Sequence, residues 1–268
     1  MRGIAFPTAA AGSQSTTRAG AQILAAALGT KDPALAQAAL GETRWRRAYP
    51  RYFRLLVEHG LASAEQALCS AEAGLDAAWQ TLCWAGPQGP ISLADALRTE
   101  APVLQGRMLK GRGEAALAPW TVPLNGQSLS GAALRTKIGD WQDRGIIEAS
   151  AADALRRCLV HPEWFDLSDR HLVLRGAGSE AEPLHWLMRW RANVVALDIA
   201  RPEVWRRIAD LGLGGNGTLT FPVQGDAAAG ADEAAWLQAA GADLIADTPA
   251  IAAWLSAVPQ ALDIGALA

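Results

Sequence analysis

The spacing of apolar residues changes character near residue 165. Before it, apolar positions recur mainly every three or four residues, the period of amphipathic helices. Pro50 is expected to open one of these helices and Ser63 to cap another. The helices are predicted around residues 24–28, 51–58, 63–84, 92–97, 130–144 and 150–161. Asn125 and Gly126, between two short extended runs, predict a hairpin or an exposed loop.

After residue 165, short apolar runs alternate with helical segments. Strands are predicted at residues 171–174, 193–198, 218–223 and 242–247, each followed by a helix, at 183–191, 202–211, 232–240 and 248–254. Another strand can begin at residues 262–264. Repeated strand and helix units form a parallel sheet with right-handed crossovers. The sequence therefore predicts an α/β fold for this part of the chain.

The first strand of this series runs into a glycine-rich turn. Residues 176–181 read Gly-Ala-Gly-Ser-Glu-Ala, and Asp198 closes the second strand 22 positions after Gly176. Strand, turn, helix, strand and terminal acid in this order resemble the Rossmann dinucleotide-binding fingerprint, with Ala181 at its third small position. The predicted fold class is thus α/β. A Rossmann-like parallel sheet of at least four strands forms a nucleotide-cofactor-binding domain (166–268), and a mostly α-helical N-terminal domain (1–165) precedes it.

The resemblance implies an NAD(P)-binding, oxidoreductase-like protein that acts on an unidentified small molecule. Backbone amides of the turn would meet the phosphates. Asp198 would bind the ribose hydroxyls and favour NAD, while Arg201 keeps NADP open. The residues that the resemblance places around the cofactor are Gly176, Ala177, Gly178, Ser179, Glu180, Asp198, Ile199 and Val223.

Two other functions remain open. Glu180 and Glu182 would repel a phosphate at the start of the helix. The same plan also resembles class I methyltransferases, whose S-adenosylmethionine carries no phosphate, although Leu174 stands where those enzymes usually place an acid. A third reading is a non-catalytic interaction or sensor module that forms a homodimer through tryptophan-rich helices.

Composition and charge limit the partners and the cellular location that these functions can have. The net charge of -3 and the pI near 5.8 give no bulk attraction to nucleic acid or to an anionic membrane. The chain has no apolar run of the ~20 residues that a membrane helix needs. Three widely spaced cysteines suit a reducing compartment, so a cytoplasmic location is expected. The four histidines have no metal-ligand spacing, so no metal site is expected.

No catalytic residue can be assigned from the sequence. The chain lacks a Tyr-x-x-x-Lys, a Gly-x-Ser-x-Gly and a His-Glu-x-x-His. Lys110 and Arg112 lie among glycines, either in a loop that closes over a bound anion or in an exposed basic turn. In an enzyme they would be the first candidates for substrate contacts from the neighbouring domain.

Overall fold

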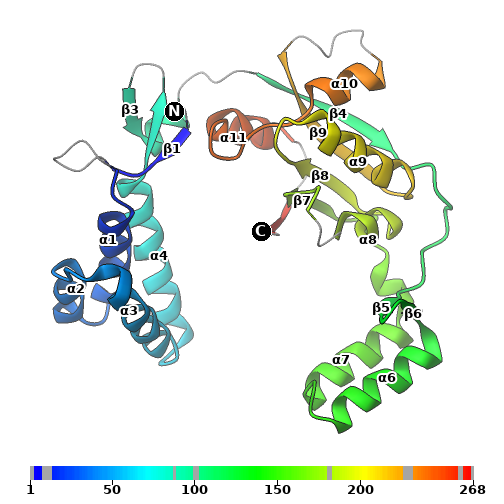
Figure 1. The fold of residues 1–268 in the computed structure, drawn as a ribbon, viewed down its shortest axis with the longest axis horizontal. Helices are drawn as coiled ribbons and strands as arrows, with labels where there is room; N and C mark the ends of the chain where they lie inside the picture. The colour runs from blue at the N-terminus through cyan, green and yellow to red at the C-terminus, as the bar shows by residue number, and fades with distance from the viewer. Residues whose placement is uncertain are drawn as a thin grey trace. The chain divides into compact units, whose positions relative to one another are not determined.

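The computed structural model describes residues 3–7, 14–86, 89–98, 103–179, 183–225, 232–258 and 262–266 (Figure 1). The chain divides into two compact units. Unit 1 comprises residues 1–101 with 245–253, and unit 2 comprises residues 102–244 with 254–268. The change in the sequence pattern predicts a boundary at residue 165. The structure divides the chain earlier because β4 (Leu104–Lys110) joins the sheet of the C-terminal part.

Unit 1 combines helices with a small antiparallel sheet. Its helices are α1 (Thr16–Gly29), α2 (Pro33–Leu40), α3 (Trp45–Gly60), α4 (Ala64–Thr81) and α5 (Leu93–Ala96). Its sheet has the order β1 (Gly3–Ala5), β2 (Cys83–Gly86), β3 (Gly89–Ser92). Most of α11 (Thr248–Ser256) belongs to this unit, and the Ile4 amide donates to the Ile245 carbonyl at 2.9 Å.

Side-chain caps and aromatic packing explain where the helices of unit 1 begin and meet. The Asp32 carboxylate accepts from the Leu35 amide at 2.9 Å and the Ser63 hydroxyl from the Gln66 amide at 3.1 Å, which satisfies amides that the first turn leaves free. Trp45 and Tyr52 stack at 5.6 Å inside the core. Pro50 lies inside α3, so the prediction that it opens the helix was wrong.

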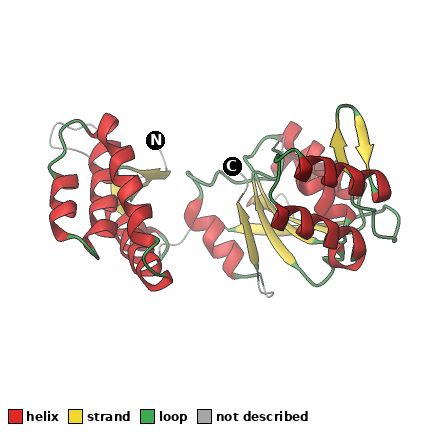
Figure 2. Ribbon diagram, turned by 90° about the horizontal axis from the view of Figure 1, so that it is seen from below, coloured by secondary structure: helices red, strands yellow, loops and turns green. Residues whose placement is uncertain are grey.

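Unit 2 is built on a five-stranded sheet in the order β10, β7, β8, β9, β4. The four strands β7 (His171–Arg175), β8 (Asn193–Leu197), β9 (Thr218–Gln224) and β10 (Asp263–Ala266) are parallel, which confirms the predicted α/β class with a parallel sheet of four strands. Strand β4 runs antiparallel to β9. Figure 2 shows these strands in yellow with helices in red beside them.

The fourth parallel strand is β10, and the strand predicted at residues 242–247 was wrong. The Gly241 amide donates to the Pro222 carbonyl at 2.9 Å and the Ala242 amide to the Asp198 carbonyl at 3.0 Å. These hydrogen bonds lead the segment across the ends of β8 and β9 instead of alongside a strand. An isolated bridge between Val223 and Ala240 forms nearby.

The main core of unit 2 lies between the sheet and its helices α8 (Pro183–Arg189), α9 (Pro202–Leu213) and α10 (Glu233–Ala239). Trp205 of α9 is fully buried, packs on Phe221 at 5.3 Å and donates its indole Nε1–H to the Ile199 carbonyl at 3.0 Å. Alternate residues of β9, Leu219, Phe221 and Val223, point into this core, as the two-residue period of a strand requires. Trp205 therefore joins α9 to the sheet.

Residues 122–165 form a separate layer of unit 2. The predicted Asn-Gly hairpin is confirmed between β5 (Val122–Leu124) and β6 (Gln127–Leu129), with Asn125 at φ 48° and Gly126 at φ 77°. Helices α6 (Gly131–Asp143) and α7 (Ala149–Val160) pack through Leu134, Ile138 and Ala152. The 3₁₀ helix η1 (Pro162–Phe165) follows.

The side chain of Arg191 holds the segments just before and just after this layer. Its guanidinium donates to the Ala115 carbonyl at 2.7 Å and lies 2.9 Å from the Asp166 carboxylate. Hydrogen bonds from Ser168, whose amide lies 3.1 Å from Asp166, together with the charge of Arg191, hold the pKa of Asp166 below its usual value.

No helix among the described residues is long and apolar enough to cross a membrane.

We expect Trp205→Ala to lower the free energy of unfolding by about 3–5 kcal/mol, because it removes a fully buried indole and leaves a cavity. Trp164→Ala is the matched control, since Trp164 is 53% exposed, and it should cost about 1 kcal/mol or less. Equilibrium urea unfolding followed by circular dichroism measures both values. Equal losses in the two variants would contradict the packing described here.

The lowered pKa of Asp166 predicts a pH-dependent contribution to stability. Because the folded protein favours the ionised carboxylate, this contribution is fully present above the usual aspartate pKa and is lost as pH falls through the folded value. Wild type should therefore exceed Asp166→Asn in stability near neutral pH, and the difference should shrink on acidification. Urea midpoints of both proteins between about pH 6 and about pH 3 measure it. A difference that stays constant with pH would contradict the assignment.

Candidate functional site

The glycine turn and Asp198 lie together at the carboxyl ends of two neighbouring strands. Strand β7 ends at Arg175, which is paired in register with Leu197 at the end of β8. Gly176 then adopts φ 69°, a left-handed conformation that favours glycine. The Gly178 amide donates to Asp198 Oδ2 at 2.8 Å. The structure thus brings the predicted turn and the predicted acid into direct contact.

Every described amide of this turn donates to an acceptor of the protein. Gly176 and Ala177 both donate to the Leu197 carbonyl, at 2.9 and 3.3 Å, and Ser179 donates to the Gly176 carbonyl at 2.9 Å. Gly178 donates to Asp198, as above. These are the donors that a pyrophosphate would need. The turn, as it stands, satisfies its own backbone.

The Asp198 carboxylate is likewise engaged on both sides. Its Oδ2 accepts from Gly178, and its Oδ1 accepts from the Ile199 amide at 2.8 Å. A ribose hydroxyl would have to share or replace one of these amides. The Ser179 hydroxyl, by contrast, is buried and has no hydrogen-bond partner among the residues that the structure describes. It is the one polar side-chain group of the described turn that is left for a ligand.

Helix α9 holds the turn from the other side. The Arg207 guanidinium donates to the Gly178 carbonyl. A Cβ added to Gly178 would lie 2.8 Å from Val204 Cγ1 and 3.2 Å from both Arg207 Nη2 and Asp198 Oδ2. The protein's own packing therefore requires glycine at this position, independently of any ligand.

The remaining predicted cofactor contacts are placed differently. Glu180 lies outside the described residues, as do Ala181 and Glu182. Ile199 is 37% exposed beside Asp198, whereas the Val223 side chain is fully buried in the core. Val223 is therefore a packing residue in this arrangement. Leu174, at the position where methyltransferases carry an acid, is also a core residue.

The basic loop after β4 lies at the opposite end of the sheet. Its glycines pack against residues 213–217, where Gly111 donates to the Gly217 carbonyl at 2.9 Å and Gly113 to the Gly215 carbonyl at 2.7 Å. Lys110 is paired in register with Thr218, the first residue of β9, so the loop lies at the amino ends of the parallel strands. The structure does not bring Lys110 and Arg112 to the glycine turn. Arg112 instead lies 3.5 Å from the Glu233 carboxylate.

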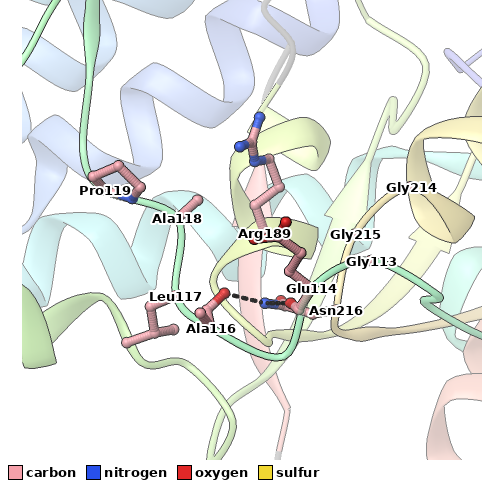
Figure 3. Close-up of a pocket in the computed structure, with 10 residues that line it drawn as sticks. All are labelled: Gly113, Glu114, Ala116, Leu117, Ala118, Pro119, Arg189, Gly214, Gly215 and Asn216. Carbon is pink, nitrogen blue, oxygen red and sulfur yellow. Dashed lines mark hydrogen bonds between the residues drawn. The ribbon is translucent and has the colours of Figure 1, made fainter.

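A cavity of about 400 Å³ adjoins this loop (Figure 3). Asn216 forms part of its lining and donates its side-chain amide to the carbonyls of Glu114 and Ala116 at 2.9 and 3.0 Å. Arg189 also lines the cavity, and its Nη1 lies 3.4 Å from His185 Nε2. Because the Asn216 side chain binds two backbone carbonyls of residues 114–116, it fixes the position of the segment that follows the basic loop.

Asp198 and the glycine turn form the candidate site of unit 2. The acid lies at the end of β8, where the resemblance requires it, but the described amides of the turn are used by the protein. Among the described residues, no group of three His, Cys, Asp or Glu side chains is placed to hold a metal ion. Comparisons with protein-family models, with curated proteins and with solved structures found no match for this chain.

We expect Gly178→Ala to destabilise unit 2 by about 1–3 kcal/mol, because the new methyl group would overlap Val204 and disturb the contact with Asp198. Gly139→Ala serves as the control, since Gly139 lies in α6 with open space around it, and alanine there should add roughly 0.5–1 kcal/mol. Thermal and urea unfolding measure both changes. A neutral Gly178→Ala would show that the turn is not packed as described.

Proposed function

We propose that unit 2 is a Rossmann-like domain that binds the adenosine end of a nucleotide cofactor. The implied class is NAD(P), in a cytoplasmic oxidoreductase-like protein that acts on a small molecule. The strand order supports this proposal. From β7 the chain moves outward through β8 and β9, then returns to place β10 on the other side of β7. This matches the order 3-2-1-4 within the Rossmann sheet.

In sheets of this type, ligands bind outside the carboxyl ends of the strands, where the order reverses. Here that point lies between β7 and β10, and the glycine turn follows β7 directly. Asp198 directly follows the adjacent strand β8 and lies within hydrogen-bond distance of the turn. This contact is the observation that carries the proposal.

The roles of the residues follow from their positions. Asp198 would exchange the Gly178 amide for ribose hydroxyls, and the Ser179 hydroxyl would gain a partner that it now lacks. The Gly178 amide, once released by Asp198, would become available to the ligand. The cofactor would supply the redox chemistry, while the described residues bind and orient it.

A non-catalytic interaction module is the second candidate. The observation that favours it is the saturation of the turn, where the amides of residues 176–179 all donate within the protein. A turn in this state needs no ligand to satisfy its backbone.

S-adenosylmethionine, which has a ribose but no phosphate, needs fewer free amides and remains the alternative cofactor.

Thermal-shift titration separates these functions, because a ligand that binds only the folded state raises the melting temperature. NAD(H) or NADP(H) should raise the melting temperature by roughly 5–10 °C when its free concentration is about a hundred times the dissociation constant. Stabilisation by S-adenosylhomocysteine alone would support the methyltransferase alternative. The absence of any shift would overturn the cofactor proposal and leave the non-catalytic module.

The Asp198→Ala variant locates the site. It should abolish the ligand-induced shift, because the ribose loses its carboxylate partner. Asp210→Ala removes an exposed acid of α9 and should retain the shift. A full shift in Asp198→Ala would mean that the ligand binds elsewhere.

A further inference from the structure

Unit 1 carries an apolar groove between α3 and α4. A cavity of about 370 Å³ lies there, and its floor is formed by small and apolar residues of α1, including Gly20 and Ala27. Tyr49 and Phe53 line it from α3, and Ala71 lines it from α4. Figure 1 shows the three helices beside one another in unit 1. The groove lies within one compact unit and is open to solvent there.

The apolar surface continues along both walls of the groove. On α3, Tyr49, Phe53 and Val57 follow one another every fourth residue and therefore share one face, and Val57 is 61% exposed. On α4, Leu68 and Leu75 stand three residues before and four residues after Ala71, and both are exposed. Contiguous apolar surface of this kind marks an interaction site more often than a free surface.

The two walls carry opposite charges. Helix α3 has four exposed arginines, Arg46, Arg47, Arg51 and Arg54, against one glutamate, Glu58, which lies 3.4 Å from Arg54. Helix α4 has three exposed carboxylates, Glu65, Glu72 and Asp76, and contains no Lys or Arg. The helix α3 beside the groove is therefore net basic and the helix α4 net acidic, and we call these two sides the basic and the acidic edge of the groove.

We propose that this groove is the interface with a second copy of the same chain. A two-fold axis through the groove sets α3 of each copy against α4 of the other, as in an isologous dimer. The basic edge of one copy then meets the acidic edge of its partner, twice, around an apolar centre. A purely acidic or purely basic partner would match one edge and be repelled by the other. A second copy matches both.

Paired charge reversals test this arrangement. Arg46→Glu/Arg54→Glu makes the α3 edge acidic, and Glu72→Arg/Asp76→Arg makes the α4 edge basic. Each variant alone repels its own kind at both contacts and should raise the dimer dissociation constant at least about tenfold. Mixed together, the two variants should form a heterodimer, because every edge again meets its opposite. Analytical ultracentrifugation of each variant and of the mixture measures this.

The apolar centre has its own test. Phe53→Asp places a charge on the groove and should yield a monomer, whereas Leu40→Asp, an exposed apolar position on α2 outside the groove lining, should leave the dimer intact. Circular dichroism confirms that both variants fold. A wild-type monomer at about 100 μM would overturn the proposal, as would a mixture of the reversed variants that stays monomeric. If the wild type is a monomer and Phe53→Asp lowers its free energy of unfolding, the groove is instead covered by another part of the same chain.

Discussion

The end of β8 holds the turn that follows β7, and the site of unit 2 depends on this contact. The Leu197 carbonyl accepts from the amides of Gly176 and Ala177, and the next residue, Asp198, accepts from Gly178. Parallel pairing of the two strands places these acceptors under the turn. Because α9 adds Arg207 and Val204 against Gly178, the backbone of the turn has little freedom to move. A ligand here competes with contacts that already exist.

The sequence predicts the parts of unit 2 that local patterns determine. Strands β7, β8 and β9 follow from apolar runs, and the hairpin at Asn125 and Gly126 follows from turn chemistry. The short apolar run at residues 242–247 predicts a strand, but hydrogen bonds from Gly241 to Pro222 and from Ala242 to Asp198 direct the segment elsewhere. Strand β4 was missed because its partner β9 lies more than a hundred residues later. Such pairing is not encoded locally.

The candidate site shows the same limit. The motif correctly places Asp198 beside the glycine turn, since both follow from the register of two adjacent strands. It cannot reveal whether the amides are free, because that depends on where their acceptors lie in the folded turn, here the Leu197 and Gly176 carbonyls and the Asp198 carboxylate. The glycines of residues 111–113 illustrate a related ambiguity, since they resemble an anion-binding loop in sequence but serve close backbone packing against residues 213–217. A glycine-rich pattern indicates that other atoms come close to the backbone, but it does not tell whether they belong to a ligand or to the protein itself.

The two units differ in how far they satisfy their own surfaces. In unit 2 the described backbone amides of the turn donate to acceptors of the protein, whereas in unit 1 apolar and charged side chains of α3 and α4 face solvent beside a groove. The first feature reduces the free energy available for a ligand, and the second leaves free energy available for association. The proposals on cofactor binding and on self-association therefore rest on separate residues in separate units. If the turn binds no cofactor, the proposal of self-association through the groove is unaffected, because the charges of α3 and α4 do not depend on what occupies the end of β7.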